Sequence, residues 1–548
     1  MDAAHGHFTH PTVHSATDGR PKQRGRAHAG RVKIVEELAG RGGGHRSETE
    51  ALDEQQLSGV GDMDPEAFRA AAHDAVDIMA DYLKGVGERP VMPAIEPGTL
   101  RPLFPAAPPD TPETIEAILA DYRRLIEPNV THWQHPRFLA YFSSAASGPG
   151  IIGEMLTAVL NANVMLWRTS PVGTELEQVV VDWFRQALGL PVEFDGLLTD
   201  TASTSSLLAL AAARQAAGVG AASQGLPGRP EVPRMRVYAS EEAHSSIEKA
   251  CMTLGLGQAG LTRIPTNGRF ELRIDALEDA IANDKKAGIR PIALVATIGT
   301  TSTTSVDPVP AMGDVAAREG IWLHIDAAHA GAVALIRERR DQFVSWERAD
   351  SVVTNPHKWF FSPVDASILL TTRMPVLRDA FSLVPEYLRT LDREGPIRDY
   401  NEYTPTLGRR FRALKLWMLL RYFGLDGLRR RIGYHLELGQ RFMRWIDDSP
   451  DFERLAPVPF STICFRYRPA ALAATQDEPT VAADLDQLNI ALMDAINRSG
   501  EVFLSHTRLR GRFTIRIALA NLRTEDADLD RVWQVIRREA AALAAAPS

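Results

Sequence analysis

The sequence predicts an α/β protein with a mostly parallel central sheet flanked by helices, a helical N-terminal segment and a small α+β domain at the C-terminal end. Two patterns support this prediction. Between residues 235 and 372, short runs rich in β-branched residues alternate with helical patterns, which is typical of a parallel sheet covered on both faces. After residue 424 the pattern changes to strand pairs and a terminal helix, which is typical of an antiparallel sheet.

The first residues differ in composition from the rest of the chain. Residues 1–62 contain one aromatic residue and six of the fifteen histidines. Such a segment buries too little apolar surface to offset its ordering entropy, so we expect a disordered extension; a metal-binding histidine tract is the alternative. Residues 63–147 then read as helices and loops, beginning with a helix that has Asp64 as its cap and Pro65 in its first turn.

Residues 148–414 are expected to form the large domain. Amphipathic helices are predicted at 150–160 and 175–188. Because helical patterns separate several of the β-rich runs, we expect these runs to pair in a mostly parallel sheet. The predicted strands are MRVYAS (235–240), IALVATI (292–298), IWLHIDAA (321–328), SVVT (351–354) and SILLTT (367–372).

Residues 415–548 are expected to form the small domain, next to an apolar helix near 412–424. STICFRYRP (461–469) predicts one strand, and EVFLSHT and RFTIRIALA predict an antiparallel pair that turns at Arg510-Gly511. A terminal helix is expected from about Thr524.

Composition narrows the class of protein. The 548 residues are 45% hydrophobic and 24% charged, as in ordinary globular proteins, and the net charge of -8 argues against nucleic acid or an anionic membrane as a partner. The sequence contains no apolar run long enough to span a membrane and no secretory signal pattern. Two cysteines far apart in sequence imply no disulfide framework, so we expect a cytoplasmic protein.

Lys358 has an unusual setting for a lysine. In NPHKWFF it follows the predicted buried strand 351–354, which Asn355-Pro356 ends, and it precedes three aromatic residues. Desolvation lowers the pKa of a lysine and frees its amine to attack carbonyl groups. A lysine that forms a Schiff base is therefore one interpretation, and a surface lysine with a buried stem is the other.

Asp326 is a second candidate residue for Schiff-base chemistry. It lies at the C-terminal end of a predicted strand, where α/β sheets bind ligands, and a pyridoxal cofactor needs both a lysine and a carboxylate at its pyridine nitrogen. A helix cap is an alternative role for Asp326. His324, Asp326 and His329 could also form a metal set, but two of the three share one predicted strand and they lack a third partner at ligand spacing, so we expect no metal.

A phosphate site is the third requirement. The hydroxyl-rich turn Thr201–Ser206 enters an Ala/Leu helix, and the free N–H groups at a helix start attract phosphate; a simple Ser/Thr cap is the alternative. GLGQAG (255–260) matches a dinucleotide motif, but it follows a helical segment and precedes an extended one, which is the reverse of the order that nucleotide binding requires.

Six motifs stand out along residues 63–545: NPHKW, HIDAAHAG, EEAHSSIEKA, ATIGTT, THWQHPRFLAYF and LGRRFRALKLW. With these motifs, residues 63–545 resemble the pyridoxal-phosphate-dependent group II amino-acid decarboxylases, most closely the aromatic-L-amino-acid decarboxylases. The resemblance implies fold type I, pyridoxal 5'-phosphate as cofactor, decarboxylation of an aromatic L-amino acid, and a homodimer whose interface involves residues 63–147.

The resemblance also implies roles for individual residues. Lys358 matches the lysine that binds the cofactor covalently, Asp326 the carboxylate at the pyridine nitrogen, and His244 the histidine that stacks on the cofactor ring and contacts substrate. Tyr387, in the charged loop 383–403, matches the tyrosine that returns a proton to Cα. Implied cofactor contacts are Thr201, Ala202, Ser203, Thr301, Asn355 and His357; implied substrate contacts are Trp133, Tyr141, Phe142 and Ser144, where Ser144 replaces a threonine common in the family.

Three alternatives stay open at this point. Relatives that make aldehydes with oxygen tend to carry phenylalanine at the position of Tyr387 or to lack the histidine matched by His244; this chain has both residues, which favours simple decarboxylation. Gly408 favours an indolic substrate, whereas Asn163 and Met165 leave room for a smaller or acidic amino acid such as glutamate, aspartate or diaminobutyrate. A binding protein without catalysis is the third alternative.

Overall fold

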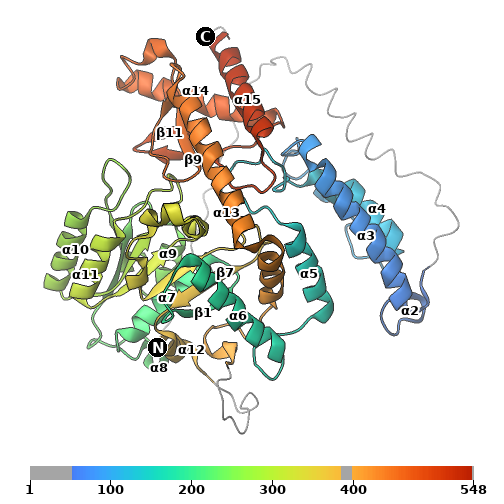
Figure 1. Ribbon diagram of the computed structural model, residues 1–548, viewed down its shortest axis with the longest axis horizontal. Coiled ribbons are helices and arrows are strands. Elements are labelled where there is room, and N and C mark those ends of the chain that lie inside the picture. The colour runs from blue at the N-terminus through green and yellow to red at the C-terminus, as the bar shows by residue number, and fades with distance from the viewer. Residues whose placement is uncertain (1–51, 384–397, 546–548) are drawn as a thin grey trace, which may run out of the picture. The chain divides into compact units, whose positions relative to one another are not determined.

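The computed structural model describes residues 52–383 and 398–545 (Figure 1). Contacts within the chain divide it into two compact units. One contains the described residues up to Ala72 together with Ala107–Ala120, and the other contains His73–Ala106 and the chain from Asp121 onward. None of the helices in the described ranges is both long enough and apolar enough to cross a bilayer.

The first unit is helical. It contains α2 (Glu54–Ser58), the start of α3 (Pro65–Gly85) and most of α4 (Ile115–Asp121). Helix α2 lies within the stretch whose composition predicts disorder, and it is held by a capping box in which Asp53 and Gln56 exchange hydrogen bonds of 2.7 and 3.1 Å. Helix α3 begins as the sequence predicts, because Asp64 accepts a 2.8 Å hydrogen bond from the backbone N–H of Glu66.

The second unit contains a seven-stranded sheet in the order β1-β7-β6-β5-β4-β2-β3. Only β7 runs against its neighbours, β1 and β6, so the prediction of a mostly parallel sheet is confirmed. The strands are β1 (Asp195–Thr199), β2 (Met235–Ser240), β3 (Leu261–Ile264), β4 (Arg290–Thr297), β5 (Trp322–Asp326), β6 (Ser351–Thr354) and β7 (Ser367–Thr371).

Strand β1 is not predicted from the sequence. Its opening pair Asp195-Gly196 reads as a turn, yet it pairs with β7 along its whole length. A Cβ at Gly196 would lie 2.0 Å from the backbone oxygen of Leu369, so only glycine allows the two strands to come this close.

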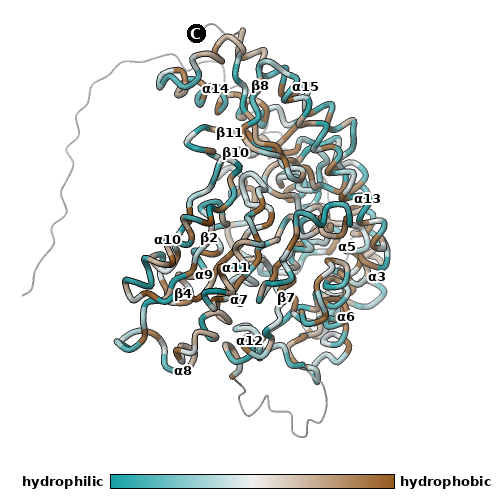
Figure 2. Tube along the Cα trace, turned by 60° about the vertical axis from the view of Figure 1, so that its left-hand side comes forward, coloured by the Kyte–Doolittle hydropathy of each residue, from teal (hydrophilic) through white to brown (hydrophobic). Residues whose placement is uncertain are grey.

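Helices cover both faces of this sheet, and as a consequence every residue of β5, β6 and β7 is buried. Helix α7 packs against five of the strands and against α9 and α12. Hydrophobic segments, drawn in brown, run through the middle of the sheet (Figure 2). The helices around it are α5 (Gly148–Leu160), α6 (Pro171–Leu188), α7 (Ala202–Ala216), α8 (Ala221–Gln224), α9 (Ser246–Thr253), α10 (Ile274–Lys286), α11 (Val309–Glu319) and α12 (Met374–Phe381).

A second, antiparallel sheet in the order β10-β11-β9-β8 follows α13 (Arg412–Asp447). Helix α13 extends well past the predicted end near residue 424, where Gly424 adopts a positive φ of 61° that interrupts the helix before it continues. The remaining elements are β8 (Phe452–Arg454), β9 (Thr462–Tyr467), α14 (Pro479–Arg498), β10 (Ser505–Leu509), β11 (Arg512–Ala518) and α15 (Asp526–Ala545).

The strand ends determine where a ligand can bind. The parallel strands β2, β4, β5 and β6 all end at one edge of the large sheet, and Asp326 at the end of β5 lies opposite Thr297 of β4 and Val353 of β6. In the small sheet, alternate residues of β11 face its apolar core, which leaves Arg516 on the other face. This edge and this face supply the walls of the cavity described next.

Candidate active site

One cavity of about 490 Å³ brings together thirteen of the fourteen residues predicted for the site. The fourteenth, Tyr387, lies outside the described residues. The predicted residues that line the cavity are Trp133, Tyr141, Phe142, Ser144, Thr201, Ala202, Ser203, His244, Thr301, Asp326, Asn355, His357 and Lys358.

Lys358 reaches the cavity from the turn after β6. The backbone N–H of Lys358 donates to the carbonyl of Asn355 at 2.9 Å, which closes that turn, and Nζ lies 5.1 Å from the centre of the Phe142 ring. Burial lowers the pKa of the Lys358 ammonium; Asp326 opposes this effect and the cation Arg516 adds to it. The amine is therefore easier to deprotonate than a lysine in water, as a nucleophile toward carbonyl groups requires.

Asp326 is buried at the end of β5, where one carboxylate oxygen accepts a 3.0 Å hydrogen bond from the N–H of Ala328. The neighbouring His324 is fully engaged by hydroxyl groups, at 3.2 Å from Ser206 and 2.9 Å from Ser351. Across residues 52–383 and 398–545, no group of three or more His, Cys, Asp or Glu side chains could hold a metal ion. The carboxylate of Asp326 is thus available to a ligand in the cavity.

The start of α7 faces the same cavity. Thr201 precedes the helix in an extended conformation, and its side chain makes no capping hydrogen bond. The hydroxyl groups of Ser205 and Ser206 bond instead to core partners, so Thr201 and Ser203 are the hydroxyl residues of this turn that line the cavity. Free N–H groups, the helix dipole and two hydroxyls form a site suited to a phosphate.

His244 follows β2 and is held by its own turn. Its Nδ1 accepts a 3.1 Å hydrogen bond from the N–H of Ser246 and lies 2.9 Å from the hydroxyl of that residue. Burial lowers the pKa of His244, Asp326 raises it, and Lys358 lowers it again. The lower pKa favours a neutral ring, and because Nδ1 accepts a hydrogen bond, the ring proton then lies on Nε2.

Asn355 and His357 hold each other in place beside Lys358. Their side chains are 3.3 Å apart, and His357 Nδ1 accepts a 3.0 Å hydrogen bond from the N–H of Ala366. Burial lowers the pKa of His357 to about 4, with Lys358 contributing. Among described residues, the buried Oδ1 of Asn355 and Oγ1 of Thr297 have no hydrogen-bond partner, although both side chains line the cavity. Such groups indicate that a ligand completes the site.

Aromatic side chains line the mouth of the cavity. Trp133 and Tyr141 stack with their ring centres 6.0 Å apart, and they are 41% and 54% exposed. Phe142 lies deeper and contacts the ring of His329 at 3.8 Å. The outer part of the cavity therefore presents flat apolar surfaces.

Arg516 is a functional candidate that the sequence analysis missed. It is buried in β11, and its Nε donates to the carbonyl of Ser302 at 3.0 Å. Within the described chain, Arg516 has no carboxylate partner and its Nη2 has no hydrogen-bond partner. Burial lowers the pKa of Arg516 to about 10. The sequence does contain a signal for Arg516, which is an arginine amid the apolar residues of the predicted strand RFTIRIALA.

The loop after β4 and strand β10 complete the wall opposite the large sheet. Ser302 and Thr507 are joined by a 3.0 Å hydrogen bond between their hydroxyls, and Ser505 and His506 also line the cavity. The residues that the sequence analysis used to judge substrate preference, Gly408, Asn163 and Met165, are not among the lining residues. The side-chain oxygen of Asn163 instead accepts a 2.9 Å hydrogen bond from the N–H of Arg409.

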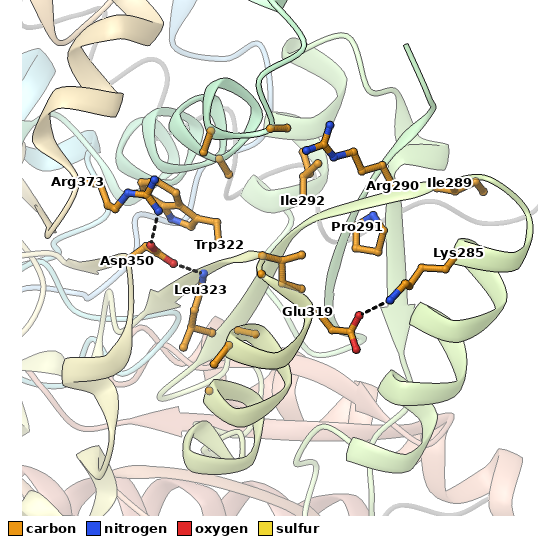
Figure 3. A pocket seen from close by; sticks show the side chains of 18 of the residues that line it. Lys285, Ile289, Arg290, Pro291, Ile292, Glu319, Trp322, Leu323, Asp350 and Arg373 are labelled. Carbon is orange, nitrogen blue, oxygen red and sulfur yellow. Dashed lines mark hydrogen bonds and ion pairs between the residues drawn. The ribbon is translucent and has the colours of Figure 1, made fainter. Parts of the chain in front are cut away.

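A larger cavity of about 820 Å³ lies at the opposite edge of the large sheet, where β4 and β5 begin (Figure 3). Several of its charged groups are already paired, Lys285 with Glu319 at 2.9 Å and Arg373 with Asp350 at 3.3 Å. No buried polar atom without a partner lines it in the described chain. The smaller cavity, with its perturbed lysine and unpartnered polar groups, is therefore the candidate active site.

Known proteins resemble this chain along most of its length. The family model described as pyridoxal-dependent decarboxylase conserved domain matches residues 97–468. The chain is 39% identical to aromatic-L-amino-acid decarboxylase of Sus scrofa over 495 residues, covering 88% of this chain and 98% of that protein. It is 38% identical to phenylacetaldehyde synthase of Arabidopsis thaliana over 490 residues, covering 88% and 97%. The crystal structure of Oryza sativa TDC with PLP and tryptamine matches with a TM-score of 0.83 at 33% identity, covering 88% and 99%.

The buried histidines predict how stability depends on pH. Burial lowers the folded-state pKa of His135, His324, His357 and His435 to about 4, whereas an unfolded histidine titrates near ~6.5. Between these values the unfolded state binds more protons, so stability should fall as pH drops from about 6.5 toward 4, by on the order of 1–2 kcal/mol per histidine at pH 5. Asp307, whose pKa burial raises to about 7, and Glu242, whose pKa burial also raises, act in the opposite direction, but they are two groups against four histidines.

Urea unfolding at pH 7, 6 and 5 checks this expectation. The midpoint should fall steadily, and His435→Gln should reduce the fall. A midpoint that stays constant or rises over this range would contradict it.

Proposed function

The chain belongs to the pyridoxal-dependent decarboxylase family, and on that premise we propose that it converts an aromatic L-amino acid into the corresponding amine and carbon dioxide. The observation that carries the proposal is that the half-buried Lys358 and the buried Asp326 line one cavity at the carboxyl edge of the large sheet. A desolvated amine and a carboxylate are the two groups that pyridoxal chemistry requires of a protein.

The cavity fits pyridoxal phosphate. Lys358 would hold it covalently through Nζ, Asp326 would keep its pyridine nitrogen protonated, and the start of α7 with Thr201 and Ser203 would bind its phosphate. His244 would cover the ring. The unpartnered Oδ1 of Asn355 and the remaining predicted contacts, Ala202, Thr301 and His357, line the same space.

When bound, the cofactor supplies an electron-poor ring that accepts the electron pair released as carbon dioxide leaves. The protein contributes position and charge. Lys358, with its lowered pKa, provides a neutral amine, and the negative charge of Asp326 stabilises the proton on the ring nitrogen. Tyr387, which lies outside the described residues, is proposed on sequence grounds to return a proton to Cα.

Arg516 is proposed to bind the carboxylate of the substrate. Its guanidinium is buried, lacks a carboxylate partner among the described residues, and keeps Nη2 free beside Phe142, whose ring centre is 4.5 Å from Cζ. A buried, unpaired guanidinium is costly unless an anion joins it, and carboxylates match its geometry.

The aromatic mouth supports an aromatic substrate. Trp133, Tyr141 and Phe142 offer flat surfaces on which an indole or phenol ring can pack, and Ser144 lies within reach of the same space. The name of the Sus scrofa relative and the tryptamine in the Oryza sativa crystal structure agree with this class. Because the Arabidopsis thaliana relative is named phenylacetaldehyde synthase, the second candidate function is an oxygen-dependent aldehyde synthase. The other alternative is a decarboxylase of a smaller or acidic amino acid.

We also propose a homodimer. Helix α5 presents apolar side chains to solvent, with Val159 and Leu160 70% and 61% exposed beside Ile152, Met155 and Leu156. A contiguous apolar face of this kind is typical of a protein interface. The cytoplasmic location expected from the sequence also stays a proposal, supported by two buried cysteines that form no disulfide.

A product assay tests the proposed reaction. The purified enzyme with pyridoxal phosphate should release carbon dioxide and an amine from tryptophan, tyrosine or DOPA, without ammonia or hydrogen peroxide. Lys358→Ala should abolish the visible absorbance of the bound cofactor and lower turnover by more than about 1,000-fold. The absence of amine from every aromatic acid, with activity toward glutamate, aspartate or diaminobutyrate, would replace the aromatic assignment; peroxide and aldehyde would indicate the synthase.

Arg516→Met should raise KM for the amino acid by about 10- to 100-fold, because a hydrogen bond to a charged group contributes about 1.5–3 kcal/mol. Arg512→Met, on the same strand but 41% exposed in its side chain, is the matched control and should change KM little. An unchanged KM in Arg516→Met, with cofactor absorbance retained, would refute the carboxylate role.

Light scattering tests the dimer. The wild-type protein should have twice the chain mass of 60.2 kDa. The substitution Val159→Asp on α5 should lower the measured mass toward that of the monomer, because the new carboxylate would be buried in the interface. Val192→Asp, at a residue 76% exposed outside α5, is the control and should leave the mass unchanged. A monomeric wild-type protein would exclude the dimer.

A further inference from the structure

His329 stands out in the wall of the active-site cavity. It is 2% exposed and its ring is stacked between two aromatic rings, with centres 3.8 Å from Phe142 and 4.7 Å from Trp359. Both ring nitrogens lack a hydrogen-bond partner in the described part of the chain. From the sequence, His329 is a candidate metal ligand only, and no group of three or more metal-binding side chains forms in the described ranges.

Packing does not explain an imidazole at this position. A phenyl ring would fill the space between Phe142 and Trp359 equally well, whereas each buried polar atom without a partner costs about 1–3 kcal/mol. The adjacent Trp359 is itself satisfied, because its Nε1 donates to His435 Nδ1 at 2.9 Å. The two nitrogens of His329 therefore require a partner that enters the cavity.

The charge state of His329 limits what that partner can be. Burial lowers the pKa of His329 well below its ordinary value, and the nearby Lys358, Arg516 and His435 add to the effect. A neutral imidazole offers one N–H donor and one acceptor. It can thus bind an anion without adding a further buried positive charge to the cavity wall.

The surroundings identify which part of a bound amino acid lies here. The proposed cofactor contacts already provide a group for each polar part of pyridoxal phosphate: α7 for the phosphate, Asp326 for the ring nitrogen and Lys358 for the aldehyde. His329 lies against Phe142, which also contacts Arg516 Cζ at 4.5 Å and Lys358 Nζ at 5.1 Å. This is the deep wall beside the amine, and the exposed aromatic mouth formed by Trp133 and Tyr141 is a separate part of the cavity.

We propose that His329 is a substrate-binding residue that donates a hydrogen bond from its neutral ring to the α-carboxylate of the amino acid, beside Arg516. The inference rests on the proposed function and adds a second donor to the carboxylate site. Two donors fix the direction of the bond between Cα and the carboxylate better than one, and this orientation decides which bond breaks. A neutral donor also holds the leaving carboxylate less strongly than a second cation, so it adds less stabilisation to the ground state.

Calorimetric titration of the cofactor-loaded enzyme with two probes tests the proposal. The probe 3-phenylpropionate carries the carboxylate and no amine, and 2-phenylethylamine carries the amine and no carboxylate. His329→Phe keeps a flat ring in the stack and removes both nitrogens. This substitution should lower the affinity for 3-phenylpropionate by about 10- to 100-fold. The affinity for 2-phenylethylamine should change by less than about twofold, since only the acid probe loses a hydrogen bond.

His329→Gln, which restores a neutral donor, should recover most of the affinity for the acid. Equal weakening of both probes, or no change in either, would overturn the proposal, as would a folded, cofactor-loaded His329→Gln that binds the acid no better than His329→Phe. Cofactor absorbance and the melting temperature verify that each variant is intact, and His329→Leu supplies the comparison if the phenylalanine variant does not hold the cofactor. Failure of the proposed function itself would appear separately, as absence of amine from the wild-type enzyme.

Discussion

The candidate site depends on one electrostatic constraint, which is that a desolvated amine and a buried carboxylate line the same cavity. Burial destabilises the charged form of Lys358, and Asp326 is the group that opposes this effect. Because Asp326 is buried and Lys358 is desolvated, their interaction is less screened than that of a surface pair. The protein fixes their positions by attaching each to the end of a buried parallel strand, and adjacent strands β5 and β6 share their register through Asp326 and Val353.

Residues of the small sheet line the same cavity. The carbonyl of Ser302 accepts hydrogen bonds from Arg516 Nε and from the thiol of Cys464, and the hydroxyl of Ser302 bonds to Thr507. Strands β9, β10 and β11 therefore hold the turn that carries Thr301 into the cavity. Arg516 is at once part of this attachment and part of the cavity wall, so the position of the small sheet directly determines the shape of the site.

The cavity has two walls with different physical character. In the deep wall, Phe142, His329, Trp359 and His435 form a continuous stack of rings, closed by the hydrogen bond between Trp359 and His435. Close packing leaves these side chains little freedom, so the polar atoms of His329 keep a fixed direction. At the mouth, Trp133 and Tyr141 are largely exposed, and their surface is available to a substrate ring or to a second chain.

By itself the sequence determined the parts that depend on neighbouring residues: the buried runs that became β2 and β6, the turn at Asn355-Pro356, the cap of α3 by Asp64, and the motifs that place Lys358, Asp326 and His244. These follow from periodicity and from the local preferences of proline and capping residues. Only the tertiary structure decided that Asp195-Gly196 begins a strand, that β7 runs antiparallel, and that Arg516 and His329 meet at Phe142. Those features depend on contacts between segments far apart in the chain, and no local pattern encodes which partner a buried charge or an unpaired ring nitrogen will face.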